Sequence, residues 1–223
     1  MKPQKPYKGM GMEGPVAKWY ASTTRNGMEE FRALAARVAR ETPGPAVLEV
    51  APGPGYVAVE MAKLGLEVTA LDISRTFVDI ASRNADAAGV MVDFRLGNVS
   101  DMPFESELFD FIFCRAAFKN FSEPVRALQE MYRVLRPGGR ALIMDLRRDT
   151  TPASISEAMG QWGLNPVNRA IVGLTFRYML LKRAYTKREF EEFLRATSFR
   201  QTEIVESTIG LEIRLEKQPA PLH

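Results

Sequence analysis

The chain has 223 residues, 46% of them hydrophobic and 26% charged, and 30 basic against 27 acidic side chains give a formal net charge of +3. This length and balance are typical of one globular α/β domain and exclude a disordered or fibrous chain, and so small a charge excess does not organise nucleic-acid binding. Cys114 is the single cysteine, which excludes an intramolecular disulfide and a thiolate metal cluster and suits a reducing compartment.

The amino-terminal segment, residues 1–42, is predicted to be an arm followed by two helices. Residues 1–15 are polar and contain several glycines and prolines, whereas 16–24 and 28–41 have helical periodicity. The run Pro43-Gly44-Pro45 ends the second helix. We expect these helices to contribute to a cap.

Strands and helices alternate from residue 44 to residue 146, as is typical of βαβ units. The predicted strands are short apolar runs at 46–51, 67–72, 90–96, 109–114 and 140–146. The predicted helices cover 56–64, 75–88 and a segment that begins from an N-cap at Ser122 and ends at Leu135. We therefore expect a cofactor-binding core of five parallel strands with helices on its faces.

The rest of the chain is predicted to hold an insertion and an antiparallel ending. Residues 149–184 interrupt the alternation with a polar start and a mostly helical stretch around 170–181, and we expect them to cap the core. Thr186-Lys187-Arg188-Glu189 fits a capping box and begins a final helix. The runs 200–206 and 211–217 alternate apolar and polar residues and predict a β-hairpin, so that 185–217 completes the sheet.

The turn after the first predicted strand is the expected ligand site. Gly53 and Gly55 allow the backbone to approach a ligand closely, and Asp72, at the end of the second strand, can accept hydrogen bonds from both hydroxyls of an adenosine ribose. These features suit either a nicotinamide dinucleotide or an adenosyl ligand. A dinucleotide also seats its pyrophosphate on a helix N-terminus. Glu49, a carboxylate just before the turn, would repel pyrophosphate and favours a cationic cofactor.

Four motifs in a fixed order carry a family resemblance. They are Val47-Leu48-Glu49-Val50-Ala51-Pro52-Gly53-Pro54-Gly55, Ala70-Leu71-Asp72-Ile73-Ser74, Gly97-Asn98-Val99-Ser100-Asp101-Met102-Pro103-Phe104 and Glu130-Met131-Tyr132-Arg133-Val134-Leu135-Arg136-Pro137-Gly138-Gly139. Through them the chain resembles class I S-adenosylmethionine-dependent methyltransferases, particularly the small-molecule branch related to quinone-biosynthesis enzymes. The resemblance implies an α/β, Rossmann-like fold with a seven-stranded, mostly parallel sheet in the order 3-2-1-4-5-7-6, one antiparallel strand and a helical cap.

The resemblance also implies which residues hold S-adenosylmethionine. Those expected at the methionine part are Glu49, Ala51, Pro52, Gly53, Gly55, Cys114 and Arg115, those at the ribose and adenine Asp72, Ile73, Asn98 and Val99. Ala51 and Asn98 stand where the family usually has glycine and aspartate. The side-chain carbonyl of Asn98 can still accept a hydrogen bond from the adenine amino group, so we expect altered contacts and retained binding.

The transfer site offers no histidine as a base, because the sole histidine is His223 in the carboxyl-terminal tail. Methyl transfer needs an aligned nucleophile, and orientation and desolvation provide much of its rate. If a base is used, Asp145 at the end of the fifth strand is the candidate. The alternative for Asp145 is an ion pair with Arg147 or Arg148.

Four further residues are candidates for substrate or lid contacts. Trp19 and Tyr20 either cover the cofactor or fasten a helix to the core. Lys119, where many relatives carry histidines, is either solvated or contacts substrate, and Tyr178 either lines a substrate cavity or packs in the core. The basic residues between 169 and 200 are either a solvated face or attract an anionic substrate or an acidic membrane surface.

The predicted activity is methyl transfer from S-adenosylmethionine to oxygen, nitrogen or carbon of a small hydrophobic or aromatic metabolite, releasing S-adenosylhomocysteine, without a metal. No nucleic-acid partner is expected, because the N-P-P-Y signature of adenine methylases is absent. No run reaches the roughly 18 uncharged apolar residues of a membrane span and no secretory signal is present, so we expect a cytoplasmic protein. Two alternatives stay open: a nicotinamide-dependent oxidoreductase and a non-catalytic module that binds an adenosyl ligand.

Overall fold

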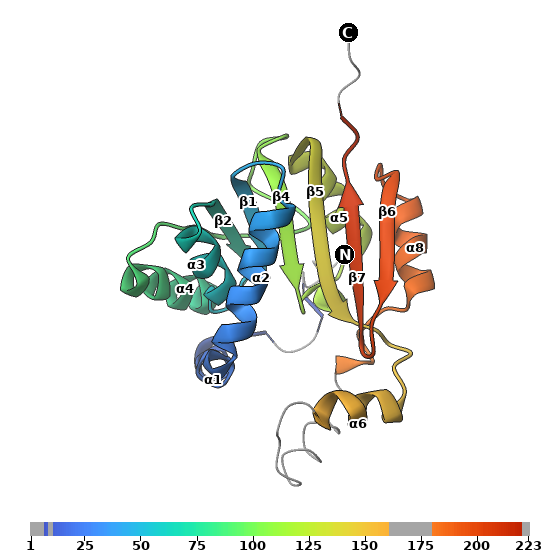
Figure 1. Cartoon of the computed structure of the whole chain (residues 1–223), viewed down its shortest axis with the longest axis horizontal. Helices are drawn as coiled ribbons and strands as arrows, with labels where there is room; N and C mark the ends of the chain where they lie inside the picture. Colours follow the sequence, from blue (N-terminus) through green and yellow to red (C-terminus); the bar gives the residue numbers. More distant parts are fainter. Residues whose placement is uncertain (1–6, 9–10, 161–179, 220–223) are drawn as a thin grey trace, which may run out of the picture.

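The computed structural model describes residues 7–8, 11–160 and 180–219, in which helices cover both faces of one sheet (Figure 1). The sheet has seven strands in the order β3-β2-β1-β4-β5-β7-β6. The strands are β1 Ala46–Val50, β2 Glu67–Asp72, β3 Asp93–Leu96, β4 Phe109–Arg115, β5 Leu135–Leu146, β6 Gln201–Glu206 and β7 Gly210–Glu216. β7 pairs antiparallel with both β5 and β6. The predicted Rossmann-like fold, its strand order and its antiparallel strand are confirmed.

The helices follow the predicted alternation. They are α1 Gly14–Thr24, α2 Met28–Glu41, α3 Tyr56–Lys63, α4 Arg75–Ala88, α5 Pro124–Val134, α6 Pro152–Gly160 and α8 Lys187–Arg195, with short 3-10 turns η1 Arg25–Gly27 and η2 Phe118–Asn120. α2 crosses in front of the sheet in Figure 1, whereas α5 and α8 lie behind it. No helix within the described ranges has both the length and the apolar character that a membrane crossing needs.

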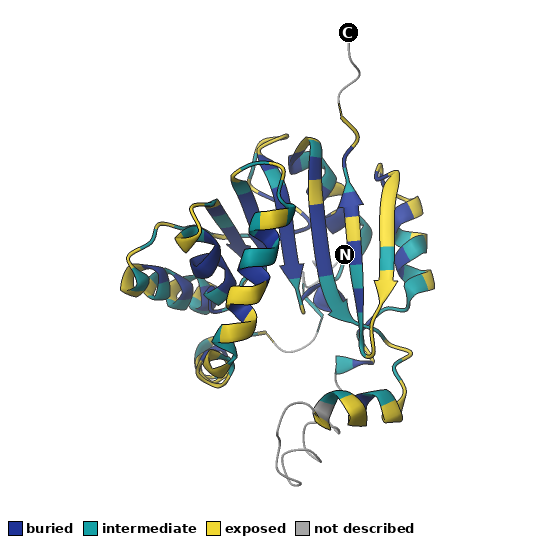
Figure 2. Cartoon of the chain, viewed as in Figure 1, coloured by how far each residue is buried: buried dark blue, intermediate teal, exposed yellow. Residues whose placement is uncertain are grey.

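The centre of the sheet is apolar on both faces, which explains why β1 and β4 read as nearly continuous hydrophobic runs. Val47 and Leu48 of β1 and Ile112 and Phe113 of β4 have no exposed surface. Each such side chain contributes about 1.5–3 kcal/mol by leaving water. Figure 2 shows buried positions along β1, β4, β5 and β7, whereas the edge strand β6 is mostly exposed.

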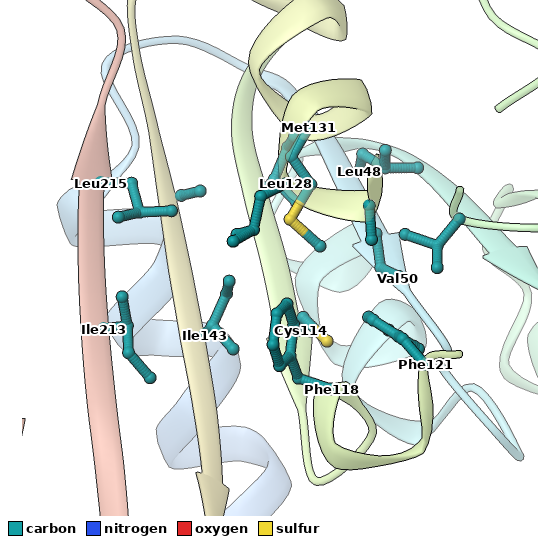
Figure 3. Packing of buried hydrophobic residues seen from close by; sticks show 14 of the residues in the cluster. Leu48, Val50, Cys114, Phe118, Phe121, Leu128, Met131, Ile143, Ile213 and Leu215 are labelled. Atoms are coloured by element: carbon teal, nitrogen blue, oxygen red, sulfur yellow. The ribbon is translucent and has the colours of Figure 1, made fainter. Parts of the chain in front are cut away.

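Two apolar clusters join the helices to the sheet. On one face, Leu34 and Val38 of α2 pack with residues of α3 and of strands β1, β2 and β4. On the other face, α5 and α8 pack against β4, β5 and β7. In Figure 3, Leu128 and Met131 of α5 lie among the side chains that the central strands present to this cluster, including Ile143 of β5. The carboxyl ends of the parallel strands stay at one edge, below the sheet in Figure 1.

The helix predicted to begin from Ser122 has its N-cap one residue later, at Glu123, so the prediction that Ser122 caps it is wrong. Pro124 occupies the first turn of α5. The fixed φ of proline suits the first helical position, and proline forces the residue before it out of the helical conformation. Proline, and not the nearest hydroxyl, therefore sets the start of this helix.

Residues 136–139, between the predicted helix and the predicted strand at 140–146, lie inside β5 as a bulge. Phe109 pairs with Leu135 and Phe111 with Arg140, so the additional residues of β5 loop out between these two pairs. Gly138, with φ of +79°, takes a conformation that favours glycine. Its N–H donates to the carbonyl of Lys217 at 2.8 Å, which satisfies a backbone group in the bulge.

The last strands and helix form as predicted, whereas the third strand is shorter. β3 begins at Asp93, because the N–H of Val90 is still bonded to the carbonyl of Ala85 at the end of α4. The capping box of Thr186 and Glu189 is present, and β6 and β7 form the antiparallel hairpin. The helix predicted around 170–181 falls almost entirely outside the described residues.

Candidate cofactor site at the carboxyl ends of β1 and β2

The turn after β1 requires glycine at two positions. Gly53 has φ of +57° and Gly55 has φ of +76°, both in the left-handed region. A Cβ on Gly55 would lie 2.7 Å from the Cβ of Ala81 and 3.0 Å from the Cζ of Phe94, whereas a Cβ on Gly53 would meet nothing within 4 Å. Gly55 therefore allows the start of α3 to pack closely against α4 and β3. Gly53 is needed only for its left-handed backbone conformation.

Ala51, the departure from the family motif, also has a left-handed conformation, with φ of +56°. Its N–H donates to the carbonyl of Leu71 at 2.8 Å, which continues the pairing of β1 with β2 to the edge of the turn. An L-residue in this region costs roughly 1–2 kcal/mol. The chain thus has an alanine in a backbone conformation that favours glycine.

Asp72 connects the end of β2 to the same turn. Its Oδ2 accepts from the N–H of Gly53 at 3.1 Å and its Oδ1 from the N–H of Ser74 at 2.8 Å. Only 6% of the residue is exposed, and this burial raises the pKa of Asp72 to about 6, against the lowering effect of the backbone hydrogen bonds from Ser74 and Gly53. A carboxylate has about four lone-pair positions, so part of its acceptor capacity remains for a ligand.

Glu49 is the buried acid at the end of β1. It is 4% exposed, and its Oε2 has no hydrogen-bond partner. Burial raises its pKa to about 8, the backbone N–H of Ala58 lowers it, and the charge of Asp72 raises it further. A buried acceptor without a donor is unfavourable, and a protonated acid at this depth becomes charged when a cation approaches. The unpartnered Oε2 atom of Glu49 could therefore accept a hydrogen bond from a cationic donor.

The residues expected at the adenine follow β2 and β3. Ile73 is exposed, and Val99 is buried in the core. The side-chain Oδ1 of half-buried Asn98 accepts from the N–H of Ser100 at 3.0 Å, which forms an Asx turn. One lone pair of the Asn98 carbonyl is thereby used within the chain and the second is left for an adenine amino group.

Cys114 and Arg115, expected on the methionine side, point in different directions. Cys114 has no exposed surface, lies near Phe118 and Phe121 in Figure 3, and its burial raises the pKa of its thiol. Arg115 donates to the carboxylate of Glu30 in α2, and its guanidinium lies 5.7 Å from the ring centre of Phe31. The positive charge of Arg115 also lowers the pKa of Glu49.

Asp145 and Lys119 form a buried ion pair. The Nζ of Lys119 lies 2.8 Å from Oδ1 of Asp145, and both side chains are 5% exposed. Oδ2 of Asp145 accepts from the N–H of Lys119 at 2.8 Å, and Oδ1 also accepts from the N–H of Leu146 at 2.7 Å. Lys119 is thus not solvated, and Asp145 pairs with Lys119 in place of the two arginines named as its alternative partners.

The predicted lid residues Trp19 and Tyr20 differ in exposure. Trp19 is 66% exposed, so its ring does not fasten α1 to the core. Tyr20 contacts Phe77 of α4 edge-on, with ring centres 5.9 Å apart, and so fastens α1 to α4. Tyr178 lies outside the described residues.

An amino-terminal strap, residues 7–8 and 11–13, crosses the same edge of the sheet and was missed by sequence reasoning. Tyr7 forms an antiparallel bridge with Phe121, and the carbonyl of Met12 accepts from the Ser74 hydroxyl at 2.6 Å. Glu13 accepts from the backbone N–H groups of residues 75 and 76 at 3.0 and 3.1 Å, at the start of α4. A polar, glycine-rich arm carries no periodic signal that predicts such contacts.

A separate hollow lies on the described surface away from these residues. This hollow of about 910 Å³ is lined by residues of β2, β3 and the end of α4, together with residues 104–109, and contains none of the predicted site residues. Within the described part of the chain, no group of three or more histidine, cysteine, aspartate or glutamate side chains is arranged to hold a metal ion.

A family model described as Methyltransferase domain matches residues 48–143, which run from the strand before the glycine turn to β5. With the strand order, the glycine turn and the two buried acids, this match makes the region similar to a class I methyltransferase domain.

The sequences to which the chain is similar include methyltransferases of quinone biosynthesis. A ubiquinone biosynthesis O-methyltransferase of Xanthomonas campestris is 34% identical over 127 residues, which are 56% of this chain and 52% of that protein. A demethylmenaquinone methyltransferase of Renibacterium salmoninarum is 32% identical over 120 residues, 54% of this chain and 49% of that protein. The chain therefore spans about half the length of the curated relatives it matches.

Solved structures share the whole fold at lower identity. A candidate S-adenosylmethionine-dependent methyltransferase from Methanococcus maripaludis aligns over 100% of both chains with a TM-score of 0.72 and 19% identity. At this level of identity the similarity shows the fold.

Proposed function

We propose that this protein transfers a methyl group from S-adenosylmethionine to oxygen, nitrogen or carbon of a small hydrophobic or aromatic metabolite. The observation that carries the proposal is the buried, unpartnered Oε2 of Glu49 beside the glycine turn. A cationic group placed against Glu49 would favour the charged form of the acid and supply the missing donor, whereas a pyrophosphate would be repelled. This charge relation favours S-adenosylmethionine over a nicotinamide dinucleotide.

The residues around the turn fit the cofactor part by part. Glu49 would accept from the ammonium group, directly or through a water. The free lone pairs of Asp72 would accept from the ribose hydroxyls, and Ile73, Asn98 and Val99 would adjoin the adenine. When bound, the cofactor supplies an electrophilic methyl group on a sulfonium.

The chain would promote the transfer by orientation and exclusion of water. The Asp145 carboxylate is already engaged by three donors, two of them backbone N–H groups, so it is assigned a structural role in place of the base considered from the sequence. The strap and α1 lie over the carboxyl edge, where they would cover bound ligands. We assign residues 1–42 and 149–184 to the cap that shapes the acceptor pocket.

The acceptor class is supported by the relatives. Their names refer to ubiquinone and demethylmenaquinone, whose rings are consistent with an apolar, aromatic acceptor. A cytoplasmic enzyme that uses neither a metal nor nucleic acid accords with the composition.

Calorimetric titration tests the cofactor assignment. We expect S-adenosylmethionine and S-adenosylhomocysteine to bind and NADH not to bind. Asp72→Ala should weaken the binding of S-adenosylhomocysteine at least tenfold, because the ribose hydroxyls lose their hydrogen-bond acceptor. Asp79→Ala, on the exposed face of α4, is the matched control and should leave the affinity unchanged. Failure of both adenosyl ligands to bind the wild-type chain, or binding of NADH alone, contradicts the proposal.

Turnover with labelled S-adenosylmethionine separates an enzyme from a binding module. We expect methylated product from at least one member of a panel of hydroxylated and aminated aromatic compounds. Tight binding of S-adenosylhomocysteine without turnover on any member would favour the non-catalytic alternative.

A further inference from the structure

Asn120, the last residue of η2, holds a second buried acceptor without a donor. The residue is 8% exposed, and its Oδ1 and the Oε2 of Glu49 are the buried side-chain polar atoms that lack a hydrogen-bond partner in the described part of the chain. The backbone of Asn120 is satisfied: its N–H donates to the carbonyl of Ala117 at 2.9 Å, and its carbonyl accepts from the N–H of Lys8 at 2.7 Å. The unpartnered buried atom of Asn120 therefore belongs to the side chain and is the amide oxygen.

The turn that presents Asn120 is held on three sides. The Lys119–Asp145 pair fastens it to β5, and Phe118 is fully buried against Phe190 of α8, with ring centres 4.6 Å apart. The strap closes over it through the bridge between Tyr7 and Phe121. Because the turn is fixed in this way, Asn120 cannot easily rotate out to find a donor in water.

The position of the turn separates Asn120 from the cofactor residues. Glu49 and Asp72 end β1 and β2, whereas Asn120 follows β4 and is fastened to β5. Burial raises the pKa of Tyr7, and the charges of both Asp72 and Asp145 raise it further, so the strap passes within electrostatic reach of both sides of the edge. A ligand that extends from β2 past β1 brings its far end toward the turn after β4.

We propose that the Oδ1 of Asn120 accepts a hydrogen bond from the methyl acceptor, which therefore carries a neutral hydroxyl or amino group on an apolar body. This inference rests on the proposed function and narrows its substrate class. A methyl acceptor with a carboxylate or phosphate at this position would place oxygen lone pairs against the amide oxygen of Asn120. It would also place a negative charge near Asp145. The contact positions the acceptor and involves no proton transfer, because an amide oxygen is too weak a base to keep a proton.

The test measures binding of small probes to the full chain saturated with S-adenosylhomocysteine. Catechol and aniline carry the donor, and veratrole and N,N-dimethylaniline are the matched compounds without it. We expect catechol or aniline to bind at least tenfold more tightly than its methylated counterpart, because a site built around an acceptor discriminates against a ligand that leaves it unpaired. If neither catechol nor aniline binds while S-adenosylhomocysteine does, the inference is overturned and the cofactor site stands.

The variant Asn120→Leu separates a binding role from a structural one. It removes the unpartnered oxygen at similar volume, so the thermal midpoint should stay unchanged or rise, while the affinity for the donor probe falls at least tenfold and that for S-adenosylhomocysteine stays within twofold. Asn26→Leu, at an exposed position, is the control and should change neither affinity.

Unchanged probe binding by folded Asn120→Leu overturns the inference. If that variant does not fold, Asn120→Ala and the comparison of each probe with its methylated counterpart on the wild-type chain decide the question. Loss of S-adenosylhomocysteine binding by the wild-type chain would instead mark failure of the proposed function itself.

Discussion

In the proposed function, Glu49 would couple cofactor binding to the release of a proton. Its pKa of about 8 means that the free protein holds the acid protonated at neutral pH, whereas a cationic ligand favours the charged form. The affinity for S-adenosylhomocysteine should therefore rise by up to about tenfold per pH unit between pH 6.5 and 8 and level off above. Titrations in two buffers of different ionisation enthalpy measure both the affinity and the proton released.

Glu49→Gln provides the matched control for this pH dependence. The glutamine is nearly isosteric but does not titrate, so its affinity should be weaker and should not change between pH 6.5 and 8. A wild-type affinity that is independent of pH over the same range would contradict the role given to Glu49.

Two single-methyl changes test the backbone of the turn. Gly55→Ala should lower the free energy of unfolding by about 2–4 kcal/mol, because it adds a left-handed alanine and a contact of 2.7 Å with Ala81. Ala51→Gly should change it by less than about 1 kcal/mol, because the relieved strain is offset by greater freedom of the unfolded chain. Urea unfolding measures both, and equal losses in the two variants would contradict the strain and the close contact predicted for an alanine at position 55.

At this scale, the sequence predicts residues whose position follows from strand ends. Glu49, Gly55 and Asp72 could be assigned because parallel strands deliver their carboxyl ends to one edge. The partner of Asp145 could not be found this way, because Lys119 reaches it from another strand connection and the nearby Arg147 and Arg148 offered closer partners in sequence. Asn120 was missed because a buried, unpartnered oxygen is visible only after packing.

The η2 turn depends on the buried pair that fastens it to β5. Removing one partner leaves an uncompensated buried charge, so Lys119→Met or Asp145→Leu alone should lower the free energy of unfolding by about 3–5 kcal/mol. The double variant should lose less than the sum of the two, because no charge remains buried. Chemical denaturation of the three variants measures the coupling, and strict additivity would show that the two side chains do not act as a pair.

At the scale of elements, periodicity and end signals predicted most boundaries. α2, α4 and β2 have the predicted bounds, since each is closed by a proline, a glycine or an acidic strand end. The start of α5 and the bulge in β5 could not be predicted, because a proline outweighs a neighbouring serine and because a bulge depends on pairing with β4. The strap has no regular secondary structure, and its contacts depend on the folded edge.

The two raised carboxyl pKa values make the free protein unusual in its response to pH. Below about pH 8 for Glu49 and about pH 6 for Asp72, the folded chain holds protons that the unfolded chain has released. The free energy of unfolding therefore falls as pH rises from about 5 to 8, by at most about 1.4 kcal/mol per pH unit for each group. Acids with lowered pKa values, such as Glu130 and Glu212, raise the free energy of unfolding as pH rises, but only in more acidic solution.

Urea unfolding at pH 5, 6.5 and 8 checks this dependence. Saturating S-adenosylhomocysteine should reduce or reverse the slope, because bound Glu49 is already charged, and Glu49→Gln should remove most of it. Stability that increases steadily from pH 5 to 8 in the free protein would contradict the raised pKa values.

The single thiol of Cys114 can report how often the centre of the sheet opens. Cys114 lies in β4 between β1 and β5 and has no exposed surface. Its burial raises the pKa of the thiol, which makes the thiol less reactive toward a labelling reagent. A reagent such as dithionitrobenzoate can reach it only when the centre of the sheet opens, so the rate of labelling reports the frequency of that opening. Since the chain has no other cysteine, the untagged protein can be followed directly, and each ligand that closes the edge should lengthen the labelling time.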